Sequence, residues 1–256
     1  MKRIAVQRYP HECVFAYWPD GTWQEFKNVH HKPRGAWALG VNDLLLLNQR
    51  PPLVLLHTHP SGIPSPSDLD TVMQLRHGYA WGIMALRGNG EDRVYEVLEP
   101  EYWGPGAPVE PLTGRSYLWG IRDCFSLVRD FYALQGIEVP NVPRVTNPGD
   151  YPPNHEYAHN YFAHWIPRVG FKEIEPHQKA FGDVAVVQLA HPYPDHCAIY
   201  LGEHKYLEHT ATRASEIRTH HYDRLSRMNA RYYRWKKCNA KTRASWSLEG
   251  PLSEGT

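Results

Sequence analysis

A run rich in proline and glycine, EPEYWGPGAPVEPLTGR at 99–115, separates two stretches of the chain that each carry a set of motifs. Proline fixes φ and lacks an amide proton, so this run cannot extend a helix or a central strand. The length of 256 residues suffices for one large domain or two modest ones. We therefore expect two domains, 1–105 and 106–256, rather than a long loop inside a single domain.

The composition is that of an ordinary globular protein, with 42% hydrophobic and 21% charged residues. The formal net charge of +1 predicts no general attraction to nucleic acid or to a membrane surface. No stretch approaches the roughly 20 apolar residues of a membrane span, and the N-terminus lacks the apolar run of a signal peptide. The four cysteines show no paired close spacing, so we expect free thiols in a protein made in a reducing cytoplasm.

The first half of the chain predicts a sheet with flanking helices. The segment PPLVLLHTHP at 51–60 is an apolar run that ends in a polar turn, as in a buried strand. The segment 67–78 predicts a helix, with Ser67 as its N-cap and Gly78 at its C-terminal stop. Further strands are expected around 80–87 and 92–99.

The second half predicts one helix against an antiparallel sheet, which makes the fold class α+β. The helix is expected at 123–136, and successive strands at 182–190, 196–202 and 205–209. The segment 143–160 is loop-like. The basic and aromatic run at 218–237 predicts a solvated helix face or a protein-contact edge rather than a surface for single-stranded nucleic acid.

Asp123 and Cys124 open the predicted helix of the second half. Asp123 is a good N-cap type, which places Cys124 in the first turn, where unpaired N–H groups and the helix dipole favour a thiolate. His196, on a separate strand, offers an imidazole that can hold the proton. A third group should orient this imidazole, and the adjacent Glu208 and His209 point to opposite faces, so we expect only one of them to reach it.

The ordered series DCFSLVRDFY, FGDVAVV, HCAIYLG and YLEH resembles the NlpC family of papain-like cell-wall peptidases. Within this family, the chain is most similar to the version fused into phage tail-assembly proteins, through the segment LTGRSYLWGIRDCFSLVRDFY at 112–132. The resemblance covers roughly 112–235 and implies Cys124 as nucleophile and His196 as base. The family usually has a histidine at the third polar position. Counting from His196, that position is Glu208 here, so we favour Glu208 over His209.

Two histidines in the first half can bind a metal together. His57 and His59 lie two residues apart on a predicted strand, so both imidazoles leave the same face. Asp70, in the first turn of the following helix, can be a third ligand, and three protein ligands with an open position are typical of catalytic zinc. An alternative is that Ser67 and Asp70 form a capping box beside two surface histidines.

The spacing of His57, His59, Ser67 and Asp70 resembles the JAMM (MPN-type) metallopeptidases over roughly residues 1–100. The resemblance implies Zn²⁺ bound by the two histidines and Asp70, with Ser67 stabilising the tetrahedral intermediate. YPHECVFAY at 9–17 matches in part the segment that carries the family's general base, which would be Glu12. Val14 stands where that family has a glycine.

These resemblances imply a tail-tip assembly protein of a tailed phage or prophage with two hydrolytic sites. The cysteine site would cleave peptidoglycan stem peptides, and the zinc site a peptide or isopeptide bond. The expected partners are other tail-tip proteins and a peptidoglycan peptide, with no nucleic acid and no membrane span. The chain would be made in the host cytoplasm and end in the virion tail tip or in an assembly intermediate. The alternatives are a structural adaptor with degenerate peptidase domains, or a host-side enzyme resembling a deubiquitinase or immune enzyme.

Overall fold

The computed structural model describes residues 1–144, 161–221 and 227–249. The chain divides into two compact units, Met1–Pro108 and Val109–Thr256, each with a sheet of its own. Within the described ranges, no helix has the length and apolar character that crossing a membrane requires. The assignment of 1–105 and 106–256 to two peptidase domains stays a prediction.

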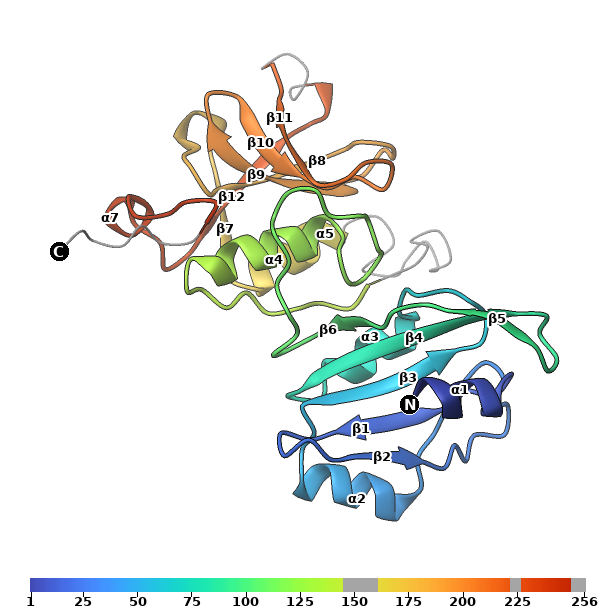
Figure 1. Cartoon of the computed structure of the whole chain (residues 1–256). Helices are drawn as coiled ribbons and strands as arrows, with labels where there is room; N and C mark the ends of the chain where they lie inside the picture. The colour runs from blue at the N-terminus through green and yellow to red at the C-terminus, as the bar shows by residue number, and fades with distance from the viewer. Residues whose placement is uncertain (145–160, 222–226, 250–256) are drawn as a thin grey trace. The chain divides into compact units, whose positions relative to one another are not determined.

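The first unit is built on a mixed sheet in the order β2-β1-β3-β4-β5, with β6 also paired to β4 (Figure 1). The strands β3 and β4 are parallel, and the other neighbours are antiparallel. The strands of this sheet are β1 (Val14–Tyr17), β2 (Trp23–Phe26), β3 (Val54–His59), β4 (Ala80–Gly88), β5 (Val94–Val97) and β6 (Glu101–Trp103).

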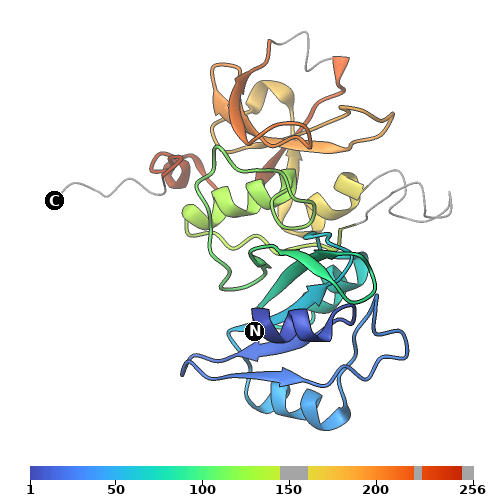
Figure 2. The ribbon, with the colours of Figure 1, turned by 45° about the vertical axis from the view of Figure 1, so that its right-hand side comes forward.

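The two faces of this sheet are used differently. Along β3, Leu56 packs with Phe15 and Met84 in a core that includes Ala5 of helix α1 (Lys2–Arg8). His57 and His59 alternate with these positions and therefore leave the opposite face. The parallel step from β3 to β4 passes through helix α3 (Asp68–Gln74), so the loop after His59 leads directly to Asp70. Helix α2 (Val41–Gln49) lies beside β2 in both views (Figures 1 and 2).

The second unit is built on an antiparallel sheet in the order β11-β10-β9-β8-β12-β7. Its described strands are β7 (Phe171–Ile174), β8 (Val184–Val187), β9 (His196–Gly202), β10 (Lys205–Glu208), β11 (Glu216–Thr219) and β12 (Arg231–Trp235). Its described helices are α4 (Cys124–Leu134), α5 (Tyr161–Arg168), the 3-10 turn η2 (Pro176–Gln178) and α7 (Ala240–Arg243).

Helices α4 and α5 cover one face of this sheet (Figures 1 and 2). Helix α4 carries apolar side chains such as Leu127, Val128 and Phe131, which are buried against alternate residues of β8 and β9. Burial of this stripe removes a large apolar area from water and fixes the helix against the sheet. The start of α4 is thereby held beside the start of β9.

Several sequence-based boundaries are wrong in detail. Helix α3 ends at Gln74 rather than near Gly78, because the amides of Arg76 and His77 bond three residues back and form turns. Of the two expectations for the basic run at 218–237, a helix face or a protein-contact edge, the helix face is wrong for its described parts in β11 and β12. The Pro- and Gly-rich run at 99–115 includes β6. Most of the expected loop at 143–160 lies outside the described residues.

Candidate functional sites

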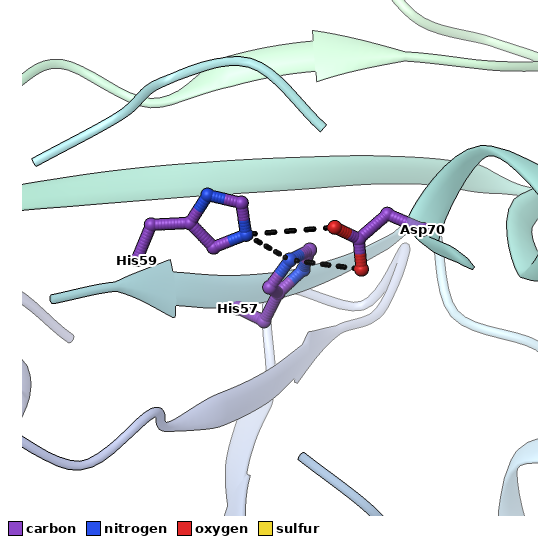
Figure 3. A group of neighbouring side chains, drawn as sticks. All are labelled: His57, His59 and Asp70. Atoms are coloured by element: carbon purple, nitrogen blue, oxygen red, sulfur yellow. Dashed lines mark hydrogen bonds and ion pairs between the residues drawn. The ribbon is translucent and has the colours of Figure 1, made fainter. Parts of the chain in front are cut away.

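Three side chains of the first unit point toward one another: His57 and His59 from β3, and Asp70 from α3 (Figure 3). Strand alternation places both imidazoles on one face, and the capped start of α3 brings the carboxylate to them. Ser67 is the N-cap, its hydroxyl accepts a hydrogen bond from the Asp70 amide, and the Asp70 carboxylate accepts one from the Ser67 amide. The capping box and the cluster of three therefore coexist, because Asp70 takes part in both.

The potential ligand atoms lie within a few ångströms of one another. The Nε2 atoms of His57 and His59 are 3.0 Å apart. His57 Nε2 lies 3.3 Å from Oδ1 of Asp70, and His59 Nε2 lies 3.5 Å from its Oδ2. Zinc–ligand bonds of about 2.0–2.1 Å in a tetrahedron require ligand atoms about 3.3 Å apart. The spacing and the donor set, two imidazoles and one carboxylate, therefore suit a divalent metal ion.

Charge and burial favour an occupant at this cluster. His57 is fully buried, and burial lowers its pKa, so its imidazole is neutral and free to donate a lone pair. Burial works against ionisation of Asp70, but His57, His59 and Ser67 together hold its pKa well below the usual range. Burial lowers and Asp70 raises the pKa of His59, and the net shift is upward, so this imidazole binds a proton more readily than that of His57. A metal ion at the cluster would take the place of that proton beside the carboxylate.

Glu12 lies at the start of β1, next to the strand that carries the two histidines. Burial raises the pKa of its carboxyl to about 7, with the charge of His59 opposing and that of Asp70 assisting the shift. A carboxyl that titrates near neutrality can take up and release a proton under physiological conditions. The assignment of Glu12 as the general base stays a prediction, and its carboxyl is close enough to His59 and Asp70 to be influenced by their charges.

In the second unit, Cys124 is the first residue of α4 and Asp123 is its N-cap, as expected. One carboxylate oxygen of Asp123 accepts the Ser126 amide at 2.8 Å, and the other accepts the Gly120 amide at 3.0 Å. Arg144 donates to both oxygens, at 2.6 and 3.1 Å, and the pair is buried. This network fixes the helix start that presents the thiol, and it holds the pKa of Asp123 below its usual value despite burial.

Cys124 and His196, the first residue of β9, are close enough for each to shift the pKa of the other. A hydrogen bond from Cys197 has the largest effect on the Cys124 pKa and lowers it; burial opposes this, and His196 lowers it further. Burial alone would lower the pKa of His196, but Cys124 and the charge of Glu208 raise it. These opposite shifts favour a thiolate–imidazolium pair. Cys124 keeps 6% of its surface exposed.

The structure places the two candidates for the third polar position differently. Glu208 stands on β10 opposite Ala198, on the same side of the sheet as His196. Its Oε2 lies 4.0 Å from Nε2 of His196. His209 is fully buried and its ring contacts Tyr117. Of the two, Glu208 is the one brought to His196.

Three residues near the thiol were not selected from the sequence. His220 Nε2 lies 2.8 Å from Oε2 of Glu208, although the sequence gives it only as part of a basic, aromatic run. The alternation of EIRT before it indicates a strand and could have placed it beside β10. Arg144 is the second residue of the segment expected to be loop-like, 143–160, and no spacing signal links it to Asp123. Burial, together with the charges of Cys124 and Asp123, raises the pKa of Tyr117 far above its usual value.

Comparisons with known proteins find similarity to one family, one phage protein and one solved structure. Residues 114–240 match the NlpC/P60 family. Tail tip assembly protein K of Escherichia phage lambda is 29% identical over 166 residues, which are 64% of this chain and 72% of that protein. The crystal structure of an NlpC/P60 family protein from Bacillus cereus ATCC 10987 is 13% identical, with a TM-score of 0.32. That alignment covers 90% of this chain and spans 65% of the solved one.

The family match includes the helix that begins with Cys124, the strand that begins with His196, and both Glu208 and His209. It leaves out the His57–His59–Asp70 cluster. Residues 114–240 are therefore an NlpC/P60 domain, in a chain homologous to a phage tail tip assembly protein.

Proposed function

We propose that this protein acts in tail-tip assembly of a tailed phage or prophage, and that its NlpC/P60 domain cleaves peptide bonds in peptidoglycan stems. The main support is the contact between the Cys124 thiol at a helix start and the His196 imidazole, with opposite pKa shifts. The protein would be made in the host cytoplasm, and other tail-tip proteins would be its partners. The lambda homologue supports this placement.

In the proposed reaction, the Cys124 thiolate attacks the carbonyl carbon of a stem-peptide bond. The imidazolium of His196 gives its proton to the leaving amine, which departs and leaves a thioester on Cys124. The neutral imidazole then takes a proton from water as the water oxygen attacks the thioester. The C–S bond of the tetrahedral intermediate then breaks, which releases the acid and leaves the Cys124 thiolate beside the protonated His196. The backbone N–H of Cys124 is a suitable donor to the oxyanion, because it lies at the helix start.

Glu208 would orient the His196 ring and stabilise its charged form. Burial opposes ionisation of Glu208, but His220, His196 and Arg218 lower its pKa, so it is a carboxylate at neutral pH. A carboxylate in this position differs from the histidine usual in the family and can perform the same orienting role.

The test is digestion of purified peptidoglycan by the full chain, with products identified by mass. We expect stem-peptide cleavage by the wild type and a loss of at least about 10⁴-fold in Cys124→Ala, since removing a nucleophile abolishes covalent catalysis. Cys238→Ser, in the same unit but only partly buried, is the matched control and should retain activity. Absence of cleavage by the wild type, alone and in assembled tails, would favour the structural adaptor.

For the first unit we propose a zinc-dependent peptide or isopeptide hydrolase site. His57, His59 and Asp70 would hold the ion, which when bound supplies Lewis-acid polarisation and acidifies a bound water. Glu12 would accept a proton at its carboxylate. Ser67 would donate to the developing oxyanion, and its hydroxyl would have to leave Oδ2 of Asp70, to which it donates at 2.6 Å.

Metal analysis of protein purified without chelator tests this second site. We expect about one zinc per chain in the wild type and none in His57→Ala, because a tetrahedral site with two remaining protein ligands holds zinc weakly. His31→Ala removes an exposed histidine of the same unit and should keep the metal. A metal-free wild type would refute the zinc proposal and leave the thiol site unaffected.

A further inference from the structure

Two residues contact the carboxylate of Glu208: Arg218 on β11, and His220, which follows that strand. Nε2 of His220 lies 2.8 Å from Oε2, and Nη1 of Arg218 donates to Oε1 at 3.0 Å. Both Glu208 and His220 are buried, at 6% and 3% exposure. Each oxygen of the carboxylate therefore has a nitrogen partner of its own, and rotation of the carboxylate would break both contacts.

The same Oε2 faces the imidazole of the proposed base. His196 Nε2 lies 4.0 Å from it and has no hydrogen-bond partner among the described residues. A carboxylate oxygen has two lone pairs and can accept from both imidazoles. A closer approach by about 1 Å would bring the His196 contact into hydrogen-bond range. His196, Glu208 and His220 thus form a row in which both imidazoles face the same oxygen, Oε2 of Glu208.

Since Glu208 is ionised and only accepts, the nitrogen that His220 presents to it must be the donor. The His220 ring also lies 5.6 Å, centroid to centroid, from Tyr206 of β10, which fixes its plane. Its backbone amide bonds to the carbonyl of His204 at 2.8 Å. The ring is thus placed by backbone pairing, by ring packing and by its bond to Glu208.

We propose that His220 is a positioning residue of the thiol site, which holds Glu208 so that the carboxylate can orient and charge His196. This inference rests on the proposed function of Cys124 and His196. It assigns a role to the residue that follows β11, in addition to the roles of Cys124, His196 and the third polar residue. Arg218 would be a second clamp, weaker because its side chain is 26% exposed.

The charged and titratable groups that face this row come from five places. Cys124 reaches His196 from α4, and Asp195 lies just before it. Glu208 and Tyr206 lie on β10, and Arg218 lies on β11. The Tyr206 hydroxyl bonds to that of Tyr232 on β12 at 3.0 Å. Loss of the His220 contact leaves Cys124 and His196 in place but frees the carboxylate that favours the charged imidazole.

The test is the alkylation rate of Cys124 by iodoacetamide between pH 5 and 9, with each labelled peptide identified by mass. In His220→Leu we expect the rate at pH 6 to fall about tenfold, as if the thiol pKa had risen by one unit. His220→Gln keeps a donor near the Nε2 position and should stay within about threefold of the wild type. His221→Gln, which alters the exposed neighbour, is the matched control.

Where His220→Leu does not fold, His220→Asn replaces it, because the shorter amide stays polar but does not reach Oε2. An unchanged or faster rate in the folded Leu or Asn variant would overturn the role of His220 while leaving the nucleophile intact. A wild-type Cys124 that is no more reactive at pH 6 than Cys238 would overturn both this inference and the proposed function. Equal losses of alkylation rate in His220→Gln and His220→Leu would also overturn the role of His220.

Discussion

The two candidate sites differ in how their charges are balanced. In the first unit, the Asp70 carboxylate is bounded by His57, His59 and Ser67, none of which carries a fixed charge. In the second unit, Asp123 is paired with Arg144, and Glu208 with Arg218. The cluster of His57, His59 and Asp70 would need an ion from outside the chain to balance the Asp70 charge, whereas the thiol site has its counter-charges in the chain.

The largest expected effect comes from removing a buried counter-charge in the second unit. Arg144→Met removes the guanidinium and leaves the Asp123 carboxylate buried without its partner. We expect a loss of about 3–5 kcal/mol in the free energy of unfolding, measured with urea, because an uncompensated buried charge is costly. Arg231→Met, which breaks an exposed pair with Glu173, should cost at most about 1 kcal/mol. Equal losses of unfolding free energy in the two variants would contradict the expectation that the buried pair matters more than the exposed one.

Metal addition should act on the first unit alone. At free zinc about 1,000-fold above its dissociation constant, we expect stabilisation of about 4 kcal/mol, seen as a rise in melting temperature. His57→Ala should abolish the rise, and Cys124→Ala should keep it. If the rise instead vanished in Cys124→Ala, zinc would be binding the thiol site, and the contrast between the two units would fail.

Removing the base should shift the pH dependence of thiol reactivity. Because the Cys124 pKa is lowered and that of His196 raised, the thiolate persists from below neutrality upward, so alkylation should vary little around pH 7. In His196→Ala the thiol loses the imidazole but keeps Cys197, so its pKa should rise part of the way toward about 8.5, and the rate at pH 6.5 should fall about tenfold. His191→Ala removes an exposed histidine and serves as control. An identical profile in His196→Ala would rule out the ion pair.

The smallest effect concerns the helix that carries a metal ligand. Ser67→Ala removes the N-cap of α3 and the hydrogen bond to Oδ2 of Asp70, so we expect a loss of about 1 kcal/mol by urea unfolding. Zinc content should remain near that of the wild type, since the three ligands are retained. Loss of zinc in this variant would assign Ser67 to the support of the metal cluster.

The convergence of His57, His59 and Asp70 could be predicted because the three residues are close in sequence. Strand alternation places His57 and His59 together, and a short connection with a capping box returns Asp70 to them. At the thiol site the helix start at Asp123 and the strand beginning at His196 were also predicted. The sequence alone left Glu208 and His209 open, since either residue can face the base depending on strand register.

Arg144 and His220 could not be selected from the sequence. Arg144 follows a stretch without regular pattern, and its bond to Asp123 depends on how the chain returns to the start of α4. His220 depends on the pairing of β10 with β11, where Lys205 stands opposite Thr219. Long-range pairings of this kind are set by packing of the whole sheet, which local periodicity does not encode.

The dual use of Asp70 has a consequence for how such a protein can change over generations. The Asp70 side chain both completes the capping box of α3 and lies among the groups that would bind an ion. A substitution there therefore alters the scaffold and the chemistry in a single step. Neither His57 nor His59 takes part in a helix cap. Drift toward a catalytically silent descendant with an intact fold would therefore be expected to start at the two imidazoles and to reach the carboxylate last.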